Sequence, residues 1–556
     1  MFNVDNFGPL FSLLREEMEG QESALNELDS AVGDGDHGFT MTRTLRAAES
    51  AAAGNFKDLG AGFDAVAEAM AENAGGAIGP LLASFFAEGG LVFSGKKEMV
   101  LEDFSRFLEG GLNAVQEVGQ ARPGDKTMVD ALAPAVEILK NRTFPSLPEG
   151  IQAAAEAARQ GAQRTREMAA ALGRASYTAE RSRGHQDAGA TSLALILTSI
   201  NKFVNGQRAS SIPADNLLEF TPPPGKLINH PGLLVSQDNQ GLALLYPDLV
   251  TLRPDGILIR SHQKDPGKAT LVIGHGGGHT PSMGGFVGAG MLDADVYGPI
   301  FTCASGVSIA RAIQAADRGG GVILLVSNHS GDVLNARLAL RRARQAGIEV
   351  EPVFLGDDIA TAPREKYLER RGLGGLLFAL KIGGAAAEGG ASLSEVVELM
   401  KKTNQRTATL SVAVRPPTHP ATGKPLFRLP PGQIEIGTGV HGEVGIYRGA
   451  HLPADEIVDL VLERLLEDLA LFLPNPVLVF VNGAGGTSKM ELHILYRRAF
   501  QQLTNQGIQV TAGVANSFFT TQEMGGFSLS LCVVDQEMQT YWERPASTPS
   551  FQWPYA

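Results

Sequence analysis

The chain has 556 residues, of which 44% are hydrophobic and 19% are charged, and its formal net charge is −13. This composition is that of a globular protein and excludes a disordered chain. The acidic charge, without a long basic run, argues against binding to the phosphate backbone of nucleic acid. The two cysteines, Cys303 and Cys532, exclude a disulfide framework and a cysteine-rich zinc site.

The chain shows no targeting signal and no membrane span. Its N-terminal segment lacks the basic start and the small-residue cleavage site of a signal peptide. No apolar run reaches the roughly 18 residues that a spanning helix needs. We therefore expect a cytoplasmic protein with neither a membrane nor a nucleic acid among its partners.

Residues 1 to about 205 predict helices. In the segment Leu59–Asn73, the apolar residues Phe63, Val66 and Met70 recur at helical spacing, and the segment 151–172 is rich in alanine. Few segments here alternate apolar and polar residues with a period of two. We predict an all-α bundle or barrel.

The pattern of hydrophobic residues changes after a proline-rich segment at 207–226, whose three consecutive prolines predict a stiff spacer. Beyond it, short runs rich in β-branched residues alternate with helical patterns, which is typical of α/β sheets with crossover helices. The predicted strands lie at 270–273, 321–326, 350–355 and 477–481, and the predicted helices at 334–345 and 454–469.

A second proline-rich segment, at 416–432, predicts a division of the α/β part into two lobes. The fold class that follows is multidomain, with an all-α domain followed by a two-lobed α/β part. The predicted boundaries are 1–206 for the all-α domain, 207–224 for the linker, and 225–415 and 416–556 for the two lobes.

The segment Leu28–Gly38 places Asp29, Asp34 and Asp36 close together, and glycines between them allow tight bends. Hard cations such as Mg²⁺ prefer oxygen ligands and often lie between carboxylates and phosphates. Three like charges also repel one another unless a cation is near. The pattern predicts a metal site, and a solvated acidic turn before a helix beginning near Phe39 is the alternative.

Further loops of the helical part carry glycine, and they lie at 74–80, 122–130, 173–176 and 184–190. Clustered glycines before a helix can offer free N–H groups to a phosphate. The chain has no Walker A motif, because Gly267 and Lys268 are followed by alanine. Each loop can be an ordinary connection between helices, but together they predict a rim that holds a nucleotide.

In the α/β part, polar loops follow predicted strands, where sheets of this class bind ligands. His279 lies in the loop 274–281, Asp332 in the loop 327–332 and His441 in the turn 437–443, and another glycine loop spans 483–487. A histidine here can move a proton to or from a hydroxyl, or can be a buried structural residue. For Asp332, spacing alone favours an N-cap of the next helix over a general base.

These motifs resemble those of dihydroxyacetone kinases. Residues 1–205 resemble the nucleotide-binding L unit through ELDSAVGDGDHG, GGAIGPLLASFF, RPGDKTMVDAL and GRASYTAERSRGHQDAGATS. Residues 225–545 resemble the ketose-binding K unit through KLINHP, GGFVGAGMLDADVYG, NHSGDVLN, KIGGAAAEGGASL, IEIGTGVHGE and VNGAGGTSKMELHILY. The resemblance covers nearly the whole chain.

The resemblance implies a covalent mechanism in the K unit. A ketose carbonyl adds to a nitrogen of His441 and forms a hemiaminal, while His279 and Asp332 hold or activate the attacking hydroxyl. The positions implied in substrate binding are Gly276, Gly277, Gly278, Ser327 and Asn328.

In the L unit, the resemblance implies that Asp29, Asp34 and Asp36 bind two Mg²⁺ ions that hold the phosphates of ATP. The positions implied in nucleotide binding are His37, Thr40, Thr42, Gly75, Gly76, Ala77, Ile78, Gly124, Met128, Arg174 and Asp187. Phosphoryl transfer depends on positioning and charge neutralisation, which such a site supplies.

The sequence departs from the family pattern in three respects. The L unit precedes the K unit, whereas the familiar single-chain kinase has the opposite order. In the K unit, Gly277 stands where serine is usual, Thr280 where glutamate is usual, and Ser327 where lysine is usual. In the L unit, Ala77 and Ile78 replace usual serines. The changes on the ketose side bear on the identity of the sugar more than on kinase activity.

We therefore expect an ATP-dependent kinase for a terminal hydroxyl of a short ketose, either dihydroxyacetone or a tetrulose such as erythrulose. The expected assembly is a homodimer, with transfer within one chain or between its two chains. The alternatives are a ketose-sensing regulatory protein without turnover, and a lyase side activity that forms cyclic FMN from FAD.

Overall fold

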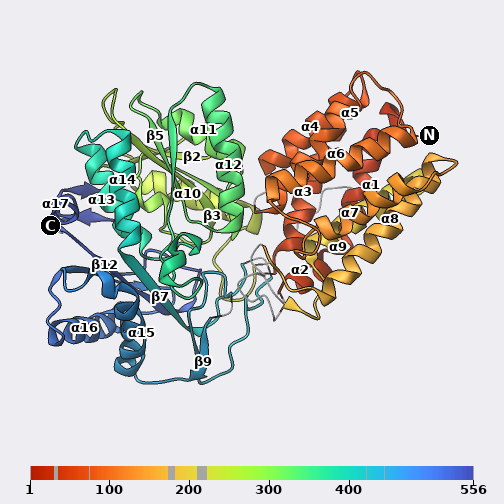
Figure 1. Ribbon diagram of the computed structural model, residues 1–556. Coiled ribbons are helices and arrows are strands. Elements are labelled where there is room, and N and C mark those ends of the chain that lie inside the picture. The colour runs from red at the N-terminus through yellow and green to blue at the C-terminus, as the bar shows by residue number, and fades with distance from the viewer. Residues whose placement is uncertain are drawn as a thin grey trace. The chain divides into compact units, whose positions relative to one another are not determined.

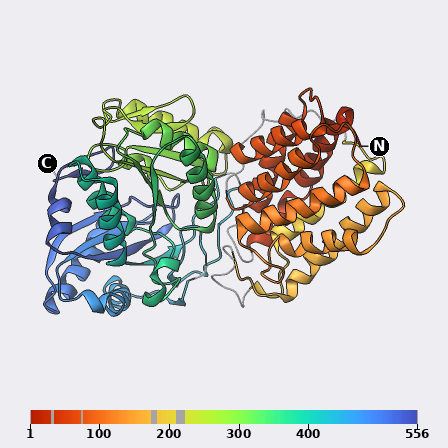
Figure 2. The ribbon, with the colours of Figure 1, turned by 45° about the horizontal axis from the view of Figure 1, so that its top comes forward.

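The computed structural model describes residues 2–30, 35–73, 76–172, 182–209, 222–420, 422–443 and 445–554. The chain divides into two compact units, Met1–Glu219 and Phe220–Ala556. In Figures 1 and 2 the first unit runs from red to yellow and the second from green to blue. None of the helices in the described ranges combines the length and the apolar character needed to cross a membrane.

Unit 1 is helical, as predicted. Its helices are α1 (Phe7–Glu19), α2 (Glu22–Ser30), α3 (His37–Ala52), α4 (Leu59–Asn73), α5 (Ile78–Val92), α6 (Leu101–Gly119), α7 (Val129–Asn141), α8 (Leu147–Arg164) and α9 (Ala188–Val204). Helices from α3 to α9 pack largely on their neighbours in the chain, and α9 also packs against α1, so that the bundle closes on itself. The predicted helix at 151–172 begins earlier and ends at Arg164, where a 3₁₀ turn (Thr165–Glu167) follows.

Phenylalanine side chains form the centre of unit 1. Phe63 of α4 is buried together with Val66 and Met70, as their helical spacing predicted. The ring centroid of Phe63 lies 5.0 Å from that of Phe7 and 5.2 Å from that of Phe107. Such tilted aromatic pairs add to the stabilisation that burial of their apolar area already gives.

Unit 2 contains two six-stranded sheets. The first has the order β1-β2-β4-β3-β5-β6 and is parallel from β4 to β6. Its strands are β1 (Val250–Leu252), β2 (Ile257–Arg260), β3 (Thr270–Gly277), β4 (Ala294–Ile300), β5 (Val322–Val326) and β6 (Val350–Phe354).

The second sheet has the order β11-β10-β12-β7-β8-β9 and is antiparallel except for the pair β10–β11. Its strands are β7 (Thr407–Arg415), β8 (Gln433–Ile436), β9 (Tyr447–Ala450), β10 (Val477–Gly483), β11 (Val510–Asn516) and β12 (Gly525–Val533). A short pair, β13 (Ala546–Ser547) and β14 (Gln552–Trp553), follows near the C-terminus.

Helices cover both faces of each sheet in unit 2. They are α10 (Leu234–Leu245), α11 (Gly306–Ala316), α12 (Ser330–Gln345), α13 (Leu376–Glu388), α14 (Leu393–Gln405), α15 (Ala454–Leu469), α16 (Lys489–Asn505) and α17 (Gln536–Glu543). Helices α11 and α12 pack on one face of the first sheet, and α15 and α16 pack on one face of the second. Helices α13 and α14 belong to the core that the two sheets share (Figure 1).

The predicted lobe boundary between residues 415 and 416 falls inside the second sheet. Strand β7 (Thr407–Arg415) already pairs with β12 and β8, so the second sheet begins before that boundary. The proline-rich segment 416–432 connects β7 to β8 within one sheet. Its proline content, which resembles that of a linker, belongs instead to a long loop that folds back on itself through an isolated antiparallel bridge between Thr418 and Pro425.

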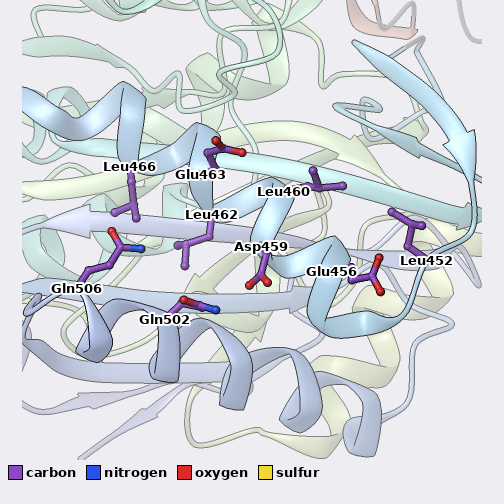
Figure 3. A pocket seen from close by; sticks show the side chains of 9 residues that line it. All are labelled: Leu452, Glu456, Asp459, Leu460, Leu462, Glu463, Leu466, Gln502 and Gln506. Atoms are coloured by element: carbon purple, nitrogen blue, oxygen red, sulfur yellow. The ribbon is translucent and has the colours of Figure 1, made fainter.

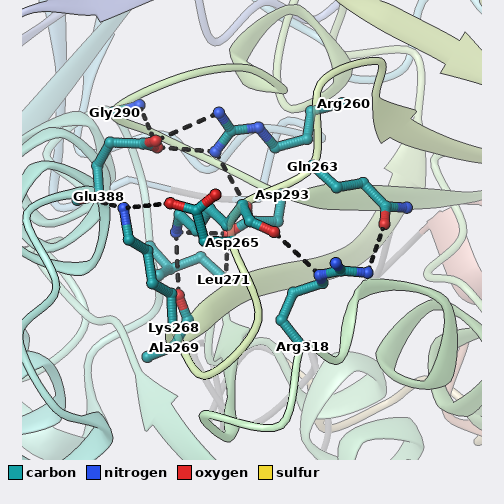
Figure 4. Close-up of polar contacts among 11 residues, drawn as sticks. Arg260, Gln263, Asp265, Lys268, Ala269, Leu271, Gly290, Asp293, Arg318 and Glu388 are labelled. Atoms are coloured by element: carbon teal, nitrogen blue, oxygen red, sulfur yellow. Dashed lines mark hydrogen bonds and ion pairs between the residues drawn. The ribbon is translucent and has the colours of Figure 1, made fainter.

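A buried charge network fixes the start of β3 against the end of α13 (Figure 4). The carboxylate of Asp293, which is 3% exposed, accepts hydrogen bonds from the backbone N–H of Leu271 and from Nζ of Lys264, each at 2.8 Å. Arg260 bridges Asp293 to Glu388, with Nη1 at 2.7 Å from Glu388 Oε2. Opposite charges and donated N–H groups compensate the desolvation of these side chains.

We predict that Asp293→Ala destabilises unit 2 strongly, by about 3 to 5 kcal/mol, because it leaves Lys264 buried without a carboxylate and removes one of the two carboxylates that Arg260 contacts. Denaturant unfolding of the full chain measures this loss. The matched control is Asp265→Ala in the same network, whose exposed carboxylate lies 3.5 Å from Lys268 and whose removal should change stability by less than about 0.5 kcal/mol. Equal effects of the two substitutions would contradict this account.

Candidate active site

The loops that follow β3 and β8 bring two of the predicted histidines into contact. His279 follows β3 and His441 follows β8, and their Nε2 atoms lie 3.1 Å apart. His279 follows a strand that the sequence predicted, whereas β8 (Gln433–Ile436), which precedes His441, was not among the predicted strands. His441 is 7% exposed, and the Phe301 ring packs 5.5 Å from its ring and 5.7 Å from that of His279. The two imidazole rings therefore pack against the same aromatic ring, that of Phe301.

The hydrogen bonds of His279 determine where its proton lies. Nδ1 of His279 lies 2.6 Å from the carbonyl oxygen of Thr520, which can only accept, so Nδ1 carries a proton. Burial, aided by His441, lowers the pKa of His279 well below its ordinary value, so the ring is neutral. Nε2 of His279 therefore has a free lone pair, and the proton between the two rings belongs to Nε2 of His441.

Asp332 lies in the first turn of α12, after β5, and its carboxylate is 7% exposed. Its Oδ2 accepts a hydrogen bond of 2.8 Å from the hydroxyl of Ser327. Because α12 begins at Ser330 and His329 occupies its N-cap position, the interpretation of Asp332 as the N-cap is wrong. The ring of His329 lies 6.4 Å from that of His441, which brings the Asp332 loop beside the histidine pair.

The predicted substrate-binding positions lie around this pair. Gly278 has a φ of +96°, and a Cβ there would meet the ring of Phe301. A Cβ at Gly276 would lie 3.1 Å from the backbone of Thr302, and one at Gly277 would meet Val235. Asn328 has a φ of +55°, and its side-chain amide donates to the carbonyl oxygens of Leu368 and Arg370.

Two buried charged residues, Glu443 and Arg371, were not among the predicted site residues. Glu443 follows His441 by two residues, and its Oε1 lies 3.7 Å from Nδ1 of that histidine. Arg371 reaches the same carboxylate from the loop after the 3₁₀ helix Arg364–Glu369, with Nη1 at 3.7 Å. The motif that contains His441 also contains Glu443, so the sequence offered a signal for Glu443. The sequence offered no signal for Arg371, which lies 70 residues before His441.

In unit 1, the acidic loop lies at the start of α3. Oδ2 of Asp29 accepts the backbone N–H groups of Gly35 and Asp36, at 2.7 and 3.2 Å. Asp36 is the N-cap of α3, which begins at His37, close to the predicted start near Phe39. Nε2 of His37 lies 3.0 Å from the hydroxyl of Ser192 in α9, and burial lowers the pKa of His37.

The loops before α7 and α9 meet the same end of the bundle. Nζ of the buried Lys126 lies within 2.6 to 3.2 Å of four carbonyl oxygens, which belong to Thr165, Met168, Ser182 and His185. Asp187 is the N-cap of α9, and a Cβ at Gly189 of that helix would approach Met128. The N–H of Gly124 donates to Asp130. One ammonium group therefore ties together the loops that carry Gly124, Met128 and Asp187.

The remaining described positions for which the sequence predicted nucleotide binding lie on α3 and at the start of α5. Thr40 and Thr42 are buried in α3, and the hydroxyl of Thr42 has no hydrogen-bond partner among the described residues. Ala77 is the N-cap of α5, Ile78 is its first residue, and Gly76 has a φ of +73°. Nε of Arg43 in α3 donates to the carbonyl of Asn73, which brings the end of α4 to α3. Asp34, Gly75 and Arg174 lie outside the described residues.

The described carboxylates of unit 1 suit a hard cation. Burial raises the pKa of Asp187 to about 7, and the like charges of Asp29 and Asp130 add to it, against the hydrogen bond from Ala190 and the charge of Lys126. Carboxylates this close repel one another unless a cation compensates them. Within the described ranges no three His, Cys, Asp or Glu side chains form a complete metal cluster.

A separate pocket of about 600 Å³ opens between α15 and α16 (Figure 3). Figure 3 shows Glu456, Asp459 and Glu463 of α15 on one side, and Gln502 at the α16 side. None of the predicted site residues lines it. The pocket therefore lies apart from the histidine pair.

Comparison with known families agrees with this arrangement. The profile described as the DAK2 domain matches residues 31–202, and the profile described as the Dak1 domain matches residues 240–550, more than half of the chain. The chain belongs to the dihydroxyacetone kinase family. The two profiles also confirm the order in which the L-type unit precedes the K-type unit.

Similar proteins in this family differ in substrate. The chain is 35% identical over 330 residues to L-erythrulose kinase of Pectobacterium atrosepticum, a match covering 59% of this chain and 56% of that protein. It is 38% identical over 312 residues to the dihydroxyacetone-binding subunit of a PTS-dependent dihydroxyacetone kinase of Listeria innocua, covering 56% and 95%. The chain thus spans little more than half the length of the single-chain erythrulose kinases that it matches.

Solved structures show the same fold for unit 2. The dihydroxyacetone kinase of C. freundii, in complex with AMP-PNP and Mg²⁺, matches with a TM-score of 0.55 and 29% identity, over 59% of this chain and 60% of that chain. A dihydroxyacetone kinase operon co-activator matches with a TM-score of 0.54 and 29% identity, over 56% and 97%.

We predict that metal-free protein loses stability as the pH rises through about 7. The pKa of Asp187 is raised above its ordinary value of 3.8, so its stabilising contribution is complete at lower pH and is lost as the carboxyl ionises. Asp187→Asn should remove this loss, because an amide does not ionise yet still accepts the N–H of Ala190. Denaturant unfolding at about pH 5 and about pH 8, with chelator present, measures the difference; identical pH dependence in both proteins would contradict the prediction.

Proposed function

We propose that the protein is an ATP-dependent kinase that phosphorylates a terminal hydroxyl of a short ketose. The observation that carries this proposal is the contact between Nε2 of His279 and Nε2 of His441. The ring of His329, three residues before the buried Asp332, lies 6.4 Å from that of His441. His279 is neutral and is held by its hydrogen bond to Thr520, so it can accept a proton from His441 and return it. Relatives named as L-erythrulose and dihydroxyacetone kinases support the class of substrate.

In this proposal, His441 is the nucleophile that holds the ketose. Nε2 of His279 takes the proton from Nε2 of His441, whose lone pair then forms a bond to the carbonyl carbon. The carbonyl π pair moves to oxygen, which receives the proton from His279, so a hemiaminal forms without any external reagent. The bond fixes one terminal hydroxyl in place, and this positioning converts the transfer into an effectively unimolecular step.

Asp332 then acts as the acceptor for the proton of the terminal hydroxyl. A buried carboxylate within reach of a substrate hydroxyl suits general-base catalysis. Ser327 donates a hydrogen bond to Asp332 at the position where the family has a lysine, so a neutral hydroxyl stands there in place of an ammonium group. This difference supports a ketose other than dihydroxyacetone, such as a tetrulose, whose additional hydroxyl can bind there.

Unit 1 supplies the nucleotide side of the proposed reaction. Asp29 and Asp36, with Asp34 of the same loop, would hold Mg²⁺. The start of α5, whose N-cap residue Ala77 makes no side-chain capping hydrogen bond, would offer N–H groups to phosphates. Two Mg²⁺ ions would neutralise the charge on the transferred phosphoryl group. The solved relative that contains AMP-PNP and Mg²⁺ supports ATP as the donor. A homodimer is the proposed assembly.

The operon co-activator that resembles unit 2 supports a second candidate, a ketose-binding regulator without turnover. The co-activator match covers 97% of that chain, whereas this chain also has the DAK2-type unit. A regulator needs no nucleotide unit, so we favour the kinase. Release of ADP distinguishes the two functions.

We predict that the protein releases ADP from Mg·ATP with one strongly preferred compound among dihydroxyacetone, both erythruloses, glyceraldehyde and the pentuloses. His441→Ala should abolish this release and leave Mg·ATP binding intact, because the substitution removes only the nucleophile. His493→Ala is the matched control, since His493 is an exposed histidine of α16. Normal turnover in His441→Ala would overturn the covalent role.

We predict that Asp29→Asn weakens the binding of Mg·AMP-PNP by at least about tenfold, because an amide replaces a charged ligand. The hydrogen bonds from Gly35 and Asp36 can persist, since the amide oxygen still accepts them. Calorimetric titration measures the affinity, and ketose binding to unit 2 should not change. Asp5→Asn, which alters an exposed carboxylate of the same unit, is the control; unchanged nucleotide affinity in Asp29→Asn would identify the loop as a simple acidic turn.

A further inference from the structure

In the turn that carries His441, the carboxylate of Glu443 contacts both the backbone and the ring of that histidine. The backbone N–H of His441 donates to Oε2 of Glu443 at 2.9 Å, and Oε1 of the same carboxylate lies 3.7 Å from Nδ1 of the ring. The backbone N–H of Gly439 closes the turn on the carbonyl of Glu443 at 3.0 Å. The two nitrogens of the ring thus face different partners, with Nε2 towards His279 and Nδ1 towards Glu443.

The carboxylate of Glu443 is ionised. Burial raises its pKa, but the charge of Arg371 and then the interaction with His441 outweigh burial, and the net pKa lies well below its ordinary value. Arg371 is itself held in place, because its Nε donates to Oδ2 of Asp358 at 2.7 Å and its Nη2 donates to the carbonyl of Gly437 at 3.3 Å. All three charged side chains are almost completely buried.

The charges of this cluster do not cancel without the histidine. Asp358 and Glu443 each carry −1 and Arg371 carries +1, so their sum is −1 next to Nδ1 of His441. A proton on Nδ1 compensates that charge at the ring nitrogen that lies 3.7 Å from the Glu443 carboxylate. The packing leaves little freedom, because a Cβ on Gly439 would collide with both the Glu443 carboxylate and the Arg371 guanidinium.

We propose that Glu443, fixed by Arg371 and Asp358, is a positioning residue that keeps a proton on Nδ1 of His441, so that a lone pair appears on Nε2 when His279 takes the Nε2 proton. This inference rests on the covalent role of His441 proposed above. A neutral imidazole has one proton, and only the nitrogen without it is nucleophilic. Without Glu443, the hydrogen bond to His279 favours the proton on Nε2, which is the wrong tautomer for attack.

The proton balance of the addition follows from this placement. His441 begins with protons on both nitrogens, and the Nε2 proton passes to Nε2 of His279. The Nε2 lone pair then forms the N–C bond, the π pair of the carbonyl moves to oxygen, and oxygen takes the proton from His279. The ring of the adduct keeps its Nδ1 proton and its positive charge, which remain paired with Glu443.

The groups that face the ring limit how its charge can vary with pH. Besides Glu443, the ring faces His279 from the loop after β3 and His329 from the start of α12, with Arg371 behind the carboxylate. His279 is held neutral by burial, and Arg371 is already engaged by two carboxylates. The negative charge of Glu443 is therefore the group whose removal should change the proton affinity of His441.

The test is the rate of adduct formation, without ATP, between the full chain and dihydroxyacetone or L-erythrulose labelled with ¹³C at the carbonyl carbon. Glu443→Gln keeps the size and the hydrogen-bonding groups but removes the charge. We expect its maximal rate to fall by at least about tenfold and the alkaline limb of its pH–rate profile to move to lower pH, because the ring then loses its shared proton more easily. Glu443→Asp, which restores the charge, should restore the position of the limb.

The matched control is Glu435→Gln, which alters another buried carboxylate of the same strand and turn, paired with Arg448 and the N–H of Gly445. It faces no histidine in the contacts described, so the alkaline limb should stay in place. A merely structural role for Glu443 would lower the rate without moving the limb. If the alkaline limb of the pH–rate profile does not move in Glu443→Gln, while the wild type forms the adduct normally, this inference is overturned and the proposed function is not.

A second measurement needs no substitution at Glu443 and applies even if that variant does not fold. The chain has 11 histidines, which can be labelled with ¹⁵N. In the labelled ketose adduct, the ring of His441 should carry a proton on Nδ1 at neutral pH. A bare Nδ1 in the adduct would overturn the inference. A wild-type chain that forms no adduct with either ketose would instead overturn the proposed covalent function, and the inference with it.

Discussion

The candidate active site depends on one hydrogen bond, from Nδ1 of His279 to the carbonyl oxygen of Thr520. It fixes the tautomer of His279, so that its Nε2 presents a lone pair to His441. The bond joins the loop after β3 of the first sheet to the loop after β11 of the second. The two sheets share one core, so the position of each histidine depends on the packing of both.

Buried charge appears in unit 2 in two different roles. Around Asp293, opposite charges and backbone N–H groups compensate one another within the cluster, and the network serves only to hold β3 and α13 together. Around Glu443, the charges of Asp358, Arg371 and Glu443 leave one negative charge over, and it faces the ring of His441. A surplus charge in a buried site is costly unless a proton or a cation compensates it. Such a surplus marks a position where chemistry is expected.

The sequence predicted the fold class because hydrophobic periodicity and strand composition are local properties. The helix Leu59–Asn73 and the strand that begins at Thr270 appear where those patterns placed them. The second sheet was harder to delimit, because β7 lies before the proline-rich segment and pairs with β12, more than 100 residues later. Pairing at such a distance leaves no local signal. Similarly, the motifs indicated His279, Asp332 and His441, while Arg371 and Thr520 join the site only through the tertiary fold.

The central claim is that His441 forms a covalent bond to the substrate. A crystal structure of the full chain grown with the preferred ketose tests it most directly. The account predicts continuous electron density from Nε2 of His441 to a tetrahedral carbon of the ketose, with Nε2 of His279 beside the new hydroxyl. A ketose held at this site with a planar carbonyl and no bond to His441, although ADP is released, would contradict the account.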